Sequence, residues 1–91
     1  MENKLLQVLL ADDDEDDRLF FKEAISEIKI KTLVTIVNDG IELMDYLHNS
    51  AVALPDIIFL DINMPRKNGI QCLDEIRSDK RLKNITIAIY S

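Results

Sequence analysis

Three carboxylates in this 91-residue sequence are spaced so that they could bind a metal ion together. Asp12 and Asp13 directly follow the apolar run 5–11, and Asp61 directly follows the apolar run 57–60. If these runs are neighbouring strands, the carboxylates meet in a crevice, where like charges at short range disfavour joint ionisation. A hard divalent cation relieves that repulsion, and oxygen ligands with several waters favour Mg²⁺ over zinc.

The other acids of the run 12–17 have an ordinary structural interpretation. Asp14 precedes a helical pattern and is expected to be its N-cap, and Glu15, Asp16 and Asp17 then fall in the first helical turn. Acidic side chains at that place complement the helix dipole. We therefore assign chemistry to Asp12, Asp13 and Asp61 and solvated roles to the rest.

The segments that deliver these acids have the pattern of buried strands. Short apolar runs predict strands at 5–11, 56–60 and 85–90, each too short for an isolated helix. The β-branched run 33–37 alternates apolar residues with Thr and predicts a shorter or more peripheral strand.

Between the strands lie three amphipathic helical patterns, over 16–28 and beginning near residues 39 and 68. The second and third begin with the capping-box spacing, in which a capping side chain precedes Glu42 or Gln71 by three residues. The expected buried faces are Phe20, Phe21, Ala24, Ile25 and Ile28; Ile41, Met44 and Leu47; and Ile70, Leu73 and Ile76.

Strictly alternating strands and helices predict an α/β fold, a doubly wound parallel sheet with helices on both faces. Right-handed crossovers put every strand's carboxyl end along one edge of the sheet, where open α/β sheets bind ligands. A chain of 91 residues allows one such domain.

Composition narrows the function further. The chain has 17 acidic against 11 basic residues and a net charge of −6, which argues against direct binding of nucleic acid. No apolar run approaches the roughly 20 residues that span a bilayer. The single cysteine, Cys72, excludes an intramolecular disulfide and fits a reducing compartment, so we expect a cytoplasmic domain.

Three motifs give the sequence a specific resemblance. They are Leu9-Leu10-Ala11-Asp12-Asp13-Asp14, Asp61-Ile62-Asn63-Met64-Pro65 followed by Gly69, and Ile89-Tyr90-Ser91. Together they resemble the receiver domain of bacterial two-component response regulators, colinearly over nearly the whole chain. The resemblance implies a flavodoxin-like fold and a phosphorylation-dependent switch.

The resemblance also implies a role for each matching residue. Asp61 would be the phosphoacceptor, taking a phosphoryl group from a sensor histidine kinase or a phosphotransfer protein. Asp13, Asp61 and the backbone carbonyl of Asn63 would hold Mg²⁺, with Asp12 assisting through water. The hydroxyl of Ser91 would bond the phosphoryl oxygen. Such a domain is a self-phosphorylating acceptor rather than a turnover enzyme.

The sequence departs from this family at its C-terminal side. A complete receiver continues after the fourth strand with a helix, a fifth strand that ends in a phosphate-pairing Lys, and a last helix. We therefore expect residues 1–91 to be an N-terminal fragment of a receiver domain. Arg66 and Lys67 do not match that Lys and are expected to be solvated charges. An apolar fourth strand at the sheet edge predicts a strand-paired or swapped homodimer.

Three other functions compete with this interpretation. Asp12-x-Asp14-x-Asp16 with Glu23 imitates a calcium loop but lacks its Gly and preceding helix. A haloacid-dehalogenase-like phosphatase also uses an aspartyl phosphate, but needs a longer chain. The serious alternative is a pseudo-receiver, a phosphorylation-independent protein-binding module.

Tyr90 is expected to be a core or interface residue.

Overall fold

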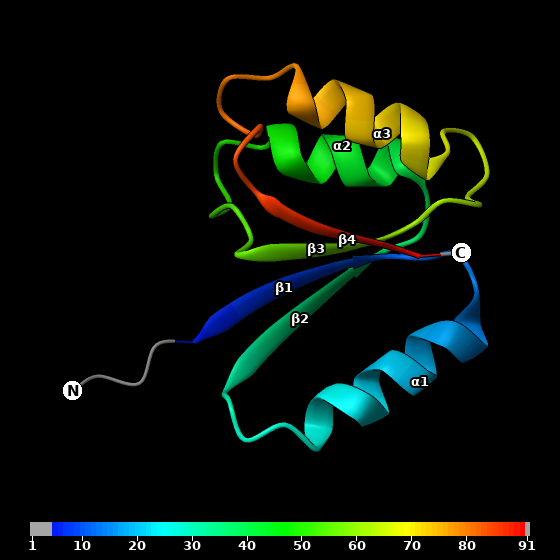
Figure 1. Cartoon of the computed structure of the whole chain (residues 1–91), viewed down its shortest axis with the longest axis vertical. Helices are drawn as coiled ribbons and strands as arrows, with labels where there is room; N and C mark the ends of the chain where they lie inside the picture. The colour runs from blue at the N-terminus through cyan, green and yellow to red at the C-terminus, as the bar shows by residue number, and fades with distance from the viewer. Residues whose placement is uncertain (1–4, 91) are drawn as a thin grey trace.

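The computed structural model describes residues 5–90, and strands and helices alternate along all of them (Figure 1). The elements are β1 (Leu6–Ala11), α1 (Glu15–Ser26), β2 (Thr32–Val37), α2 (Gly40–His48), β3 (Ile57–Asp61), α3 (Gly69–Arg77) and β4 (Thr86–Tyr90). Their order is the predicted one, and the predicted boundaries differ only at the ends of the elements. Ser91 lies outside the described residues.

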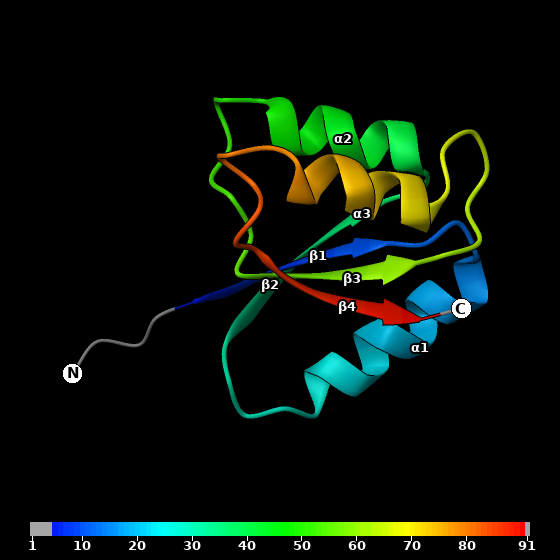
Figure 2. The ribbon, with the colours of Figure 1, turned by 45° about the horizontal axis from the view of Figure 1, so that its top comes forward.

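The strands form one parallel sheet in the order β2-β1-β3-β4. Helices α2 and α3 cover one face and α1 lies on the other (Figures 1 and 2). This arrangement confirms the predicted doubly wound α/β fold. Because Ala11 of β1 is opposite Leu60 of β3, the carboxyl ends of these two strands lie side by side. Within residues 5–90, no helix is long and apolar enough to cross a bilayer.

The main hydrophobic core lies between the sheet and the α2–α3 layer. Alternate residues of β1 and β3 point into it, among them Leu9 and Ala11 from β1 and Ile58 and Leu60 from β3. Helices α2 and α3 contribute buried residues that include Leu43, Met44, Leu47, Cys72 and Ile76. Cys72 is buried as a small apolar side chain.

The prediction for the buried face of α1 was partly wrong. No residue of this helix is fully buried, and Phe20 is 71% exposed. Phe21 and Ile25 are half-buried, and the Phe21 ring meets the Phe59 ring edge-on with centroids 4.8 Å apart. Ile28, in the same row as Phe20, is 48% exposed and lies beyond Ser26, the last residue of α1.

The predicted faces of α2 and α3 were wrong in their first turns. Ile41 is 37% exposed and Ile70 is 53% exposed, while Leu43 and Cys72 are fully buried. The sheet lies against a face rotated from the one predicted, and a short helix has too few apolar positions to fix that rotation.

All three predicted helix caps are present. Asp14 accepts hydrogen bonds from the Asp16 and Asp17 amides, and Asn68 forms the complete reciprocal box with Gln71. In α2 the box is only half formed, because Asp39 accepts from the Glu42 amide but the Glu42 side chain accepts from Asn38 (2.7 Å). Each helix therefore begins at a defined residue near the carboxyl edge of the sheet.

Candidate functional site

The three predicted carboxylates do meet at the carboxyl edge of the sheet. Asp12, Asp13 and Asp61 each offer an oxygen, and these oxygens lie within 4.8 Å of one another. Asp12 is fully buried and Asp61 is 6% exposed, whereas Asp13 is exposed. Adjacent β1 and β3 produce this cluster, because they end level with each other. We call these three residues the acidic cluster.

Asp12 is held by hydrogen bonds on both sides of its carboxylate. Its Oδ1 accepts from the Asp14 amide at 2.9 Å, and its Oδ2 accepts from the Tyr90 hydroxyl at 2.5 Å. Its own amide donates to the Val37 carbonyl of β2 at 3.1 Å. A buried carboxylate needs such donors, because an unsatisfied one carries a large desolvation cost.

Asp61 occupies an environment that disfavours its charge. Burial raises the pKa of the Asp61 carboxyl, and the nearby charges of Asp12 and Asp13 raise it further. The Asn63 amide, which donates to Asp61 Oδ1 at 3.0 Å, opposes these effects. The hydrogen-bond donors of the protein therefore compensate only part of the negative charge of the acidic cluster.

That imbalance fits a divalent cation. The donor set consists of carboxylate oxygens, two of them buried and one open to solvent, which suits a hard cation that retains waters. Asn63 follows Asp61 in an exposed loop, and the role predicted for its carbonyl stays a prediction. The role predicted for Ser91 lies outside the described residues.

The loop after Asp61 packs tightly against the end of β3. The Gly69 amide donates to the Ile62 carbonyl at 2.9 Å. A Cβ atom at Gly69 would lie 2.5 Å from the Asp61 carbonyl oxygen and 2.8 Å from the Ile62 Cα. Residue 69 therefore needs to be glycine, because a side chain there would push the loop off the backbone of Asp61.

The prediction that Arg66 and Lys67 are merely solvated was wrong. The Arg66 guanidinium lies 3.4 Å from Asp39, and Lys67 pairs with Glu75 of α3. Arg66 adopts a positive φ of 66°, which turns the loop at this point. The two cations thus connect the loop after Asp61 to the start of α2 and to α3.

Sequence reasoning missed two polar contacts of Asp12. One is the hydroxyl of Tyr90 at the end of β4, and the other is Arg18, whose guanidinium donates to the Asp12 carbonyl and to the Asn38 side chain, both at 3.0 Å. A tyrosine as the last residue of an apolar strand was an available signal, since a buried tyrosine usually finds a partner for its hydroxyl.

Comparisons with known proteins agree with this geometry. The family described as the response regulator receiver domain matches residues 8–91. The response regulator Rcp1 of Synechocystis is 29% identical over 88 residues, which cover 92% of this chain and 60% of that protein.

Two solved structures are similar along almost all of the chain. A phosphorylated cyanobacterial phytochrome response regulator, RcpA, has a TM-score of 0.89 and 33% identity, covering 94% of this chain and 64% of that one. The Mn²⁺-bound form of Rcp1 has a TM-score of 0.89 and 28% identity, covering 92% of this chain and 63% of that one. The chain thus spans less than two thirds of the length of these relatives.

Proposed function

Because this chain belongs to the response regulator receiver domain family of two-component systems, we propose that it accepts a phosphoryl group on Asp61 from a histidine kinase or a phosphotransfer protein. The observation that carries the proposal is the acidic cluster, in which Asp61 lies with Asp12 and Asp13 at the carboxyl edge of the sheet. A donor histidine would approach at that edge, where Asp13 is exposed.

The reaction needs an oxygen nucleophile and charge neutralisation. A carboxylate oxygen of Asp61 forms a bond to phosphorus while the P–N bond to the donor imidazole breaks, and the electron pair of that bond stays on the nitrogen. An ionised Asp61 needs no general base. The Asn63 amide on Oδ1 fixes the rotation of the carboxylate, which favours in-line attack.

The groups proposed to hold Mg²⁺ are the side chains of Asp12, Asp13 and Asp61 and the backbone carbonyl of Asn63. The ion would supply charge neutralisation between Asp61 and the phosphoryl oxygens when bound. The oxygen donor set supports this assignment, as does the bound Mn²⁺ in the structure of Rcp1. The hydroxyl of Ser91 is proposed to bond the phosphoryl oxygen, and the added charge of about −2 is proposed to change the conformation of the domain.

In this proposal the chain is a signalling acceptor and not a turnover enzyme. It works in the cytoplasm, with the kinase or phosphotransfer protein as its partner and without contacting membrane or nucleic acid. The net charge of −6 supports the last point, because phosphate backbones repel such a surface. A second copy of the chain is the other proposed partner.

The test is the intact mass of the protein after exposure to acetyl phosphate, with Mg²⁺ or with EDTA. We expect a gain of one phosphoryl group that requires Mg²⁺ and is lost in Asp61→Asn. Asp45→Asn is the matched control, because Asp45 is an exposed acid of α2 outside the acidic cluster. This variant should gain the phosphoryl group as the wild type does.

Two outcomes would contradict the proposal. A phosphoryl gain that persists in Asp61→Asn would place the acceptor elsewhere. No gain in wild-type protein, although it binds Mg²⁺ and is folded by circular dichroism, would favour the pseudo-receiver, which binds partners without phosphorylation.

A further inference from the structure

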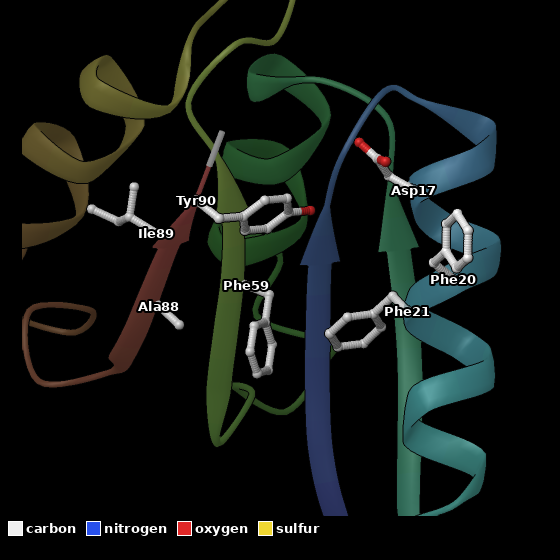
Figure 3. A pocket seen from close by; sticks show the side chains of 7 residues that line it. All are labelled: Asp17, Phe20, Phe21, Phe59, Ala88, Ile89 and Tyr90. Atoms are coloured by element: carbon white, nitrogen blue, oxygen red, sulfur yellow. The ribbon is translucent and has the colours of Figure 1, made fainter.

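Tyr90 contacts the acidic cluster from β4, the strand on the other side of β3 from β1. It is the last residue of β4, opposite Asp61 in the strand register. Its ring lies over β3 on the α1 face of the sheet, and its hydroxyl points toward the carboxyl end of β1 (Figure 3). There the hydroxyl donates to Asp12 Oδ2 at 2.5 Å.

The Tyr90 ring borders an apolar groove on the α1 face of the sheet (Figure 3). Phe21 of α1 and Phe59 of β3 line this groove with Tyr90, whereas the Ile89 side chain points away from the Tyr90 ring (Figure 3). Packing against this surface would serve any apolar side chain at residue 90, so it does not account for the hydroxyl. The hydroxyl is the one feature that distinguishes tyrosine from phenylalanine here, and it is directed at the acidic cluster.

The phenol is a lasting donor to Asp12. A phenol has an ordinary pKa of about 10, so Tyr90 keeps its proton at neutral pH and can donate it to Asp12. The Asp14 amide donates to Oδ1 and the Tyr90 hydroxyl donates to Oδ2, so the Asp12 carboxylate is held in one orientation. Each oxygen still has a lone pair for a cation or its bound water.

We propose that the Tyr90 hydroxyl is a positioning group for cation binding, which holds the Asp12 carboxylate in the orientation that serves a divalent ion shared with Asp13 and Asp61. The inference rests on the proposed function, since it concerns the same cluster. Tyr90 acts through Asp12, in the way that outer-shell partners orient the ligands of metal sites.

The first test is the Mn²⁺ affinity of Tyr90→Phe, followed by the electron paramagnetic resonance signal of the free ion. Loss of an outer-shell partner typically weakens metal binding 10- to 100-fold, so we expect a drop of about 10-fold. Tyr46→Phe is the matched control, because Tyr46 of α2 packs against the core on the opposite face of the sheet. This variant should bind Mn²⁺ as the wild type does.

The second test uses the natural fluorescence of the chain and leaves the Tyr90 hydroxyl intact. The sequence has two tyrosines and no tryptophan, so Tyr90 is the sole emitter of that kind in Tyr46→Phe. Titration of this variant with Mg²⁺ should change the Tyr90 emission saturably, because its hydrogen-bond acceptor gains a cation. The Tyr46 emission of Tyr90→Phe should stay constant over the same range.

Each outcome decides the inference. A folded Tyr90→Phe that binds Mn²⁺ as tightly as wild type would overturn it and leave the proposed phosphoacceptor function intact. If Tyr90→Phe does not fold, constant Tyr90 emission in Tyr46→Phe at saturating Mg²⁺ would overturn it instead. If wild-type protein binds neither ion, this inference and the Mg²⁺ part of the proposed function fail together, while the mass measurement judges Asp61 separately.

Discussion

At the acidic cluster, the arrangement that favours function disfavours stability. Asp61 is almost completely buried beside two other carboxylates, and these surroundings raise the pKa of its carboxyl. A raised pKa means that the folded state holds the proton more tightly than the unfolded state does. The protonated Asp61 carboxyl therefore contributes to the stability of the fold below the unfolded pKa, near 3.8. This contribution is lost as the pH rises through the folded pKa.

Because ionisation of Asp61 destabilises the folded state, we can predict the effect of Asp61→Asn on stability in EDTA. At pH 7 the substitution removes a buried charge that its neighbours repel, so the urea midpoint should rise above that of wild type. The difference should shrink as the pH falls through the folded pKa and below 3.8, where the wild-type carboxyl becomes protonated in both states. Equilibrium urea unfolding between pH 3.5 and pH 8 measures both effects.

Mg²⁺ provides the complementary control for this prediction. It should raise the urea midpoint of wild type at pH 7 and raise that of Asp61→Asn less, because binding to the folded state stabilises it. An Asp61→Asn variant that is less stable than wild type at pH 7 in EDTA would show that the carboxylate is neutralised within the protein.

The sequence contained enough information to predict the acidic cluster but not the tyrosine that completes it. Asp12 and Asp61 follow apolar runs directly, so strand pattern alone predicts that they end at the same sheet edge. The Tyr90–Asp12 hydrogen bond joins residues 78 positions apart, one at the end of β4 and one directly after β1, and these two strands do not pair with each other. It depends on the lateral order of the strands and on side-chain direction, which periodicity does not give.

Among the elements, α1 shows most clearly what periodicity leaves open. Its pattern identified an apolar stripe but could not show how much of that stripe the sheet covers. Phe21 is half-buried against Phe59, whereas the adjacent Phe20 is 71% exposed. The capping residues were predictable because their spacing is local, and a helix face is not, because it depends on the surface opposite.

The two phenylalanines make a matched pair for a stability measurement. Phe21→Ala should destabilise the fold by about 2 kcal/mol, below the roughly 3–5 kcal/mol typical of a fully buried ring. Phe20→Ala should change stability by no more than about 0.5 kcal/mol, as exposed substitutions do. Urea unfolding of both variants checks this, and equal losses would mean that α1 packs through both rows.

A second prediction at this scale concerns the loop that joins β3 to α3. Gly69→Ala would place a Cβ atom 2.5 Å from the Asp61 carbonyl oxygen, so the loop must move. We expect a loss of about 1–3 kcal/mol, as for other overpacked sites, and slower phosphorylation at Asp61. Ile70→Ala is the control, because Ile70 is the next residue of the same helix and is 53% exposed. Wild-type stability in Gly69→Ala would contradict the close approach.

For the whole molecule, the open side of the sheet is the prominent surface. Within residues 5–90, β4 is an edge strand that pairs with β3 alone. A groove of about 500 Å³ runs between β4 and α1, lined largely by Phe20, Phe21, Phe59, Ile89 and Tyr90 (Figure 3). An unpaired strand edge beside an exposed apolar groove is a site for pairing with another strand.

A second copy of this chain meets both needs, because β4 of one copy pairing with β4 of another continues the sheet and covers Ile89, which is 41% exposed. Sedimentation equilibrium should therefore show a dimer that dissociates on dilution. Ile89→Lys should raise the dissociation constant of this dimer at least about 10-fold, because a charge on the edge strand opposes pairing. Ile70→Lys, which alters an exposed isoleucine of α3, should leave the dimer intact. A wild-type chain that stays monomeric at high concentration would show that β4 does not recruit its own copy.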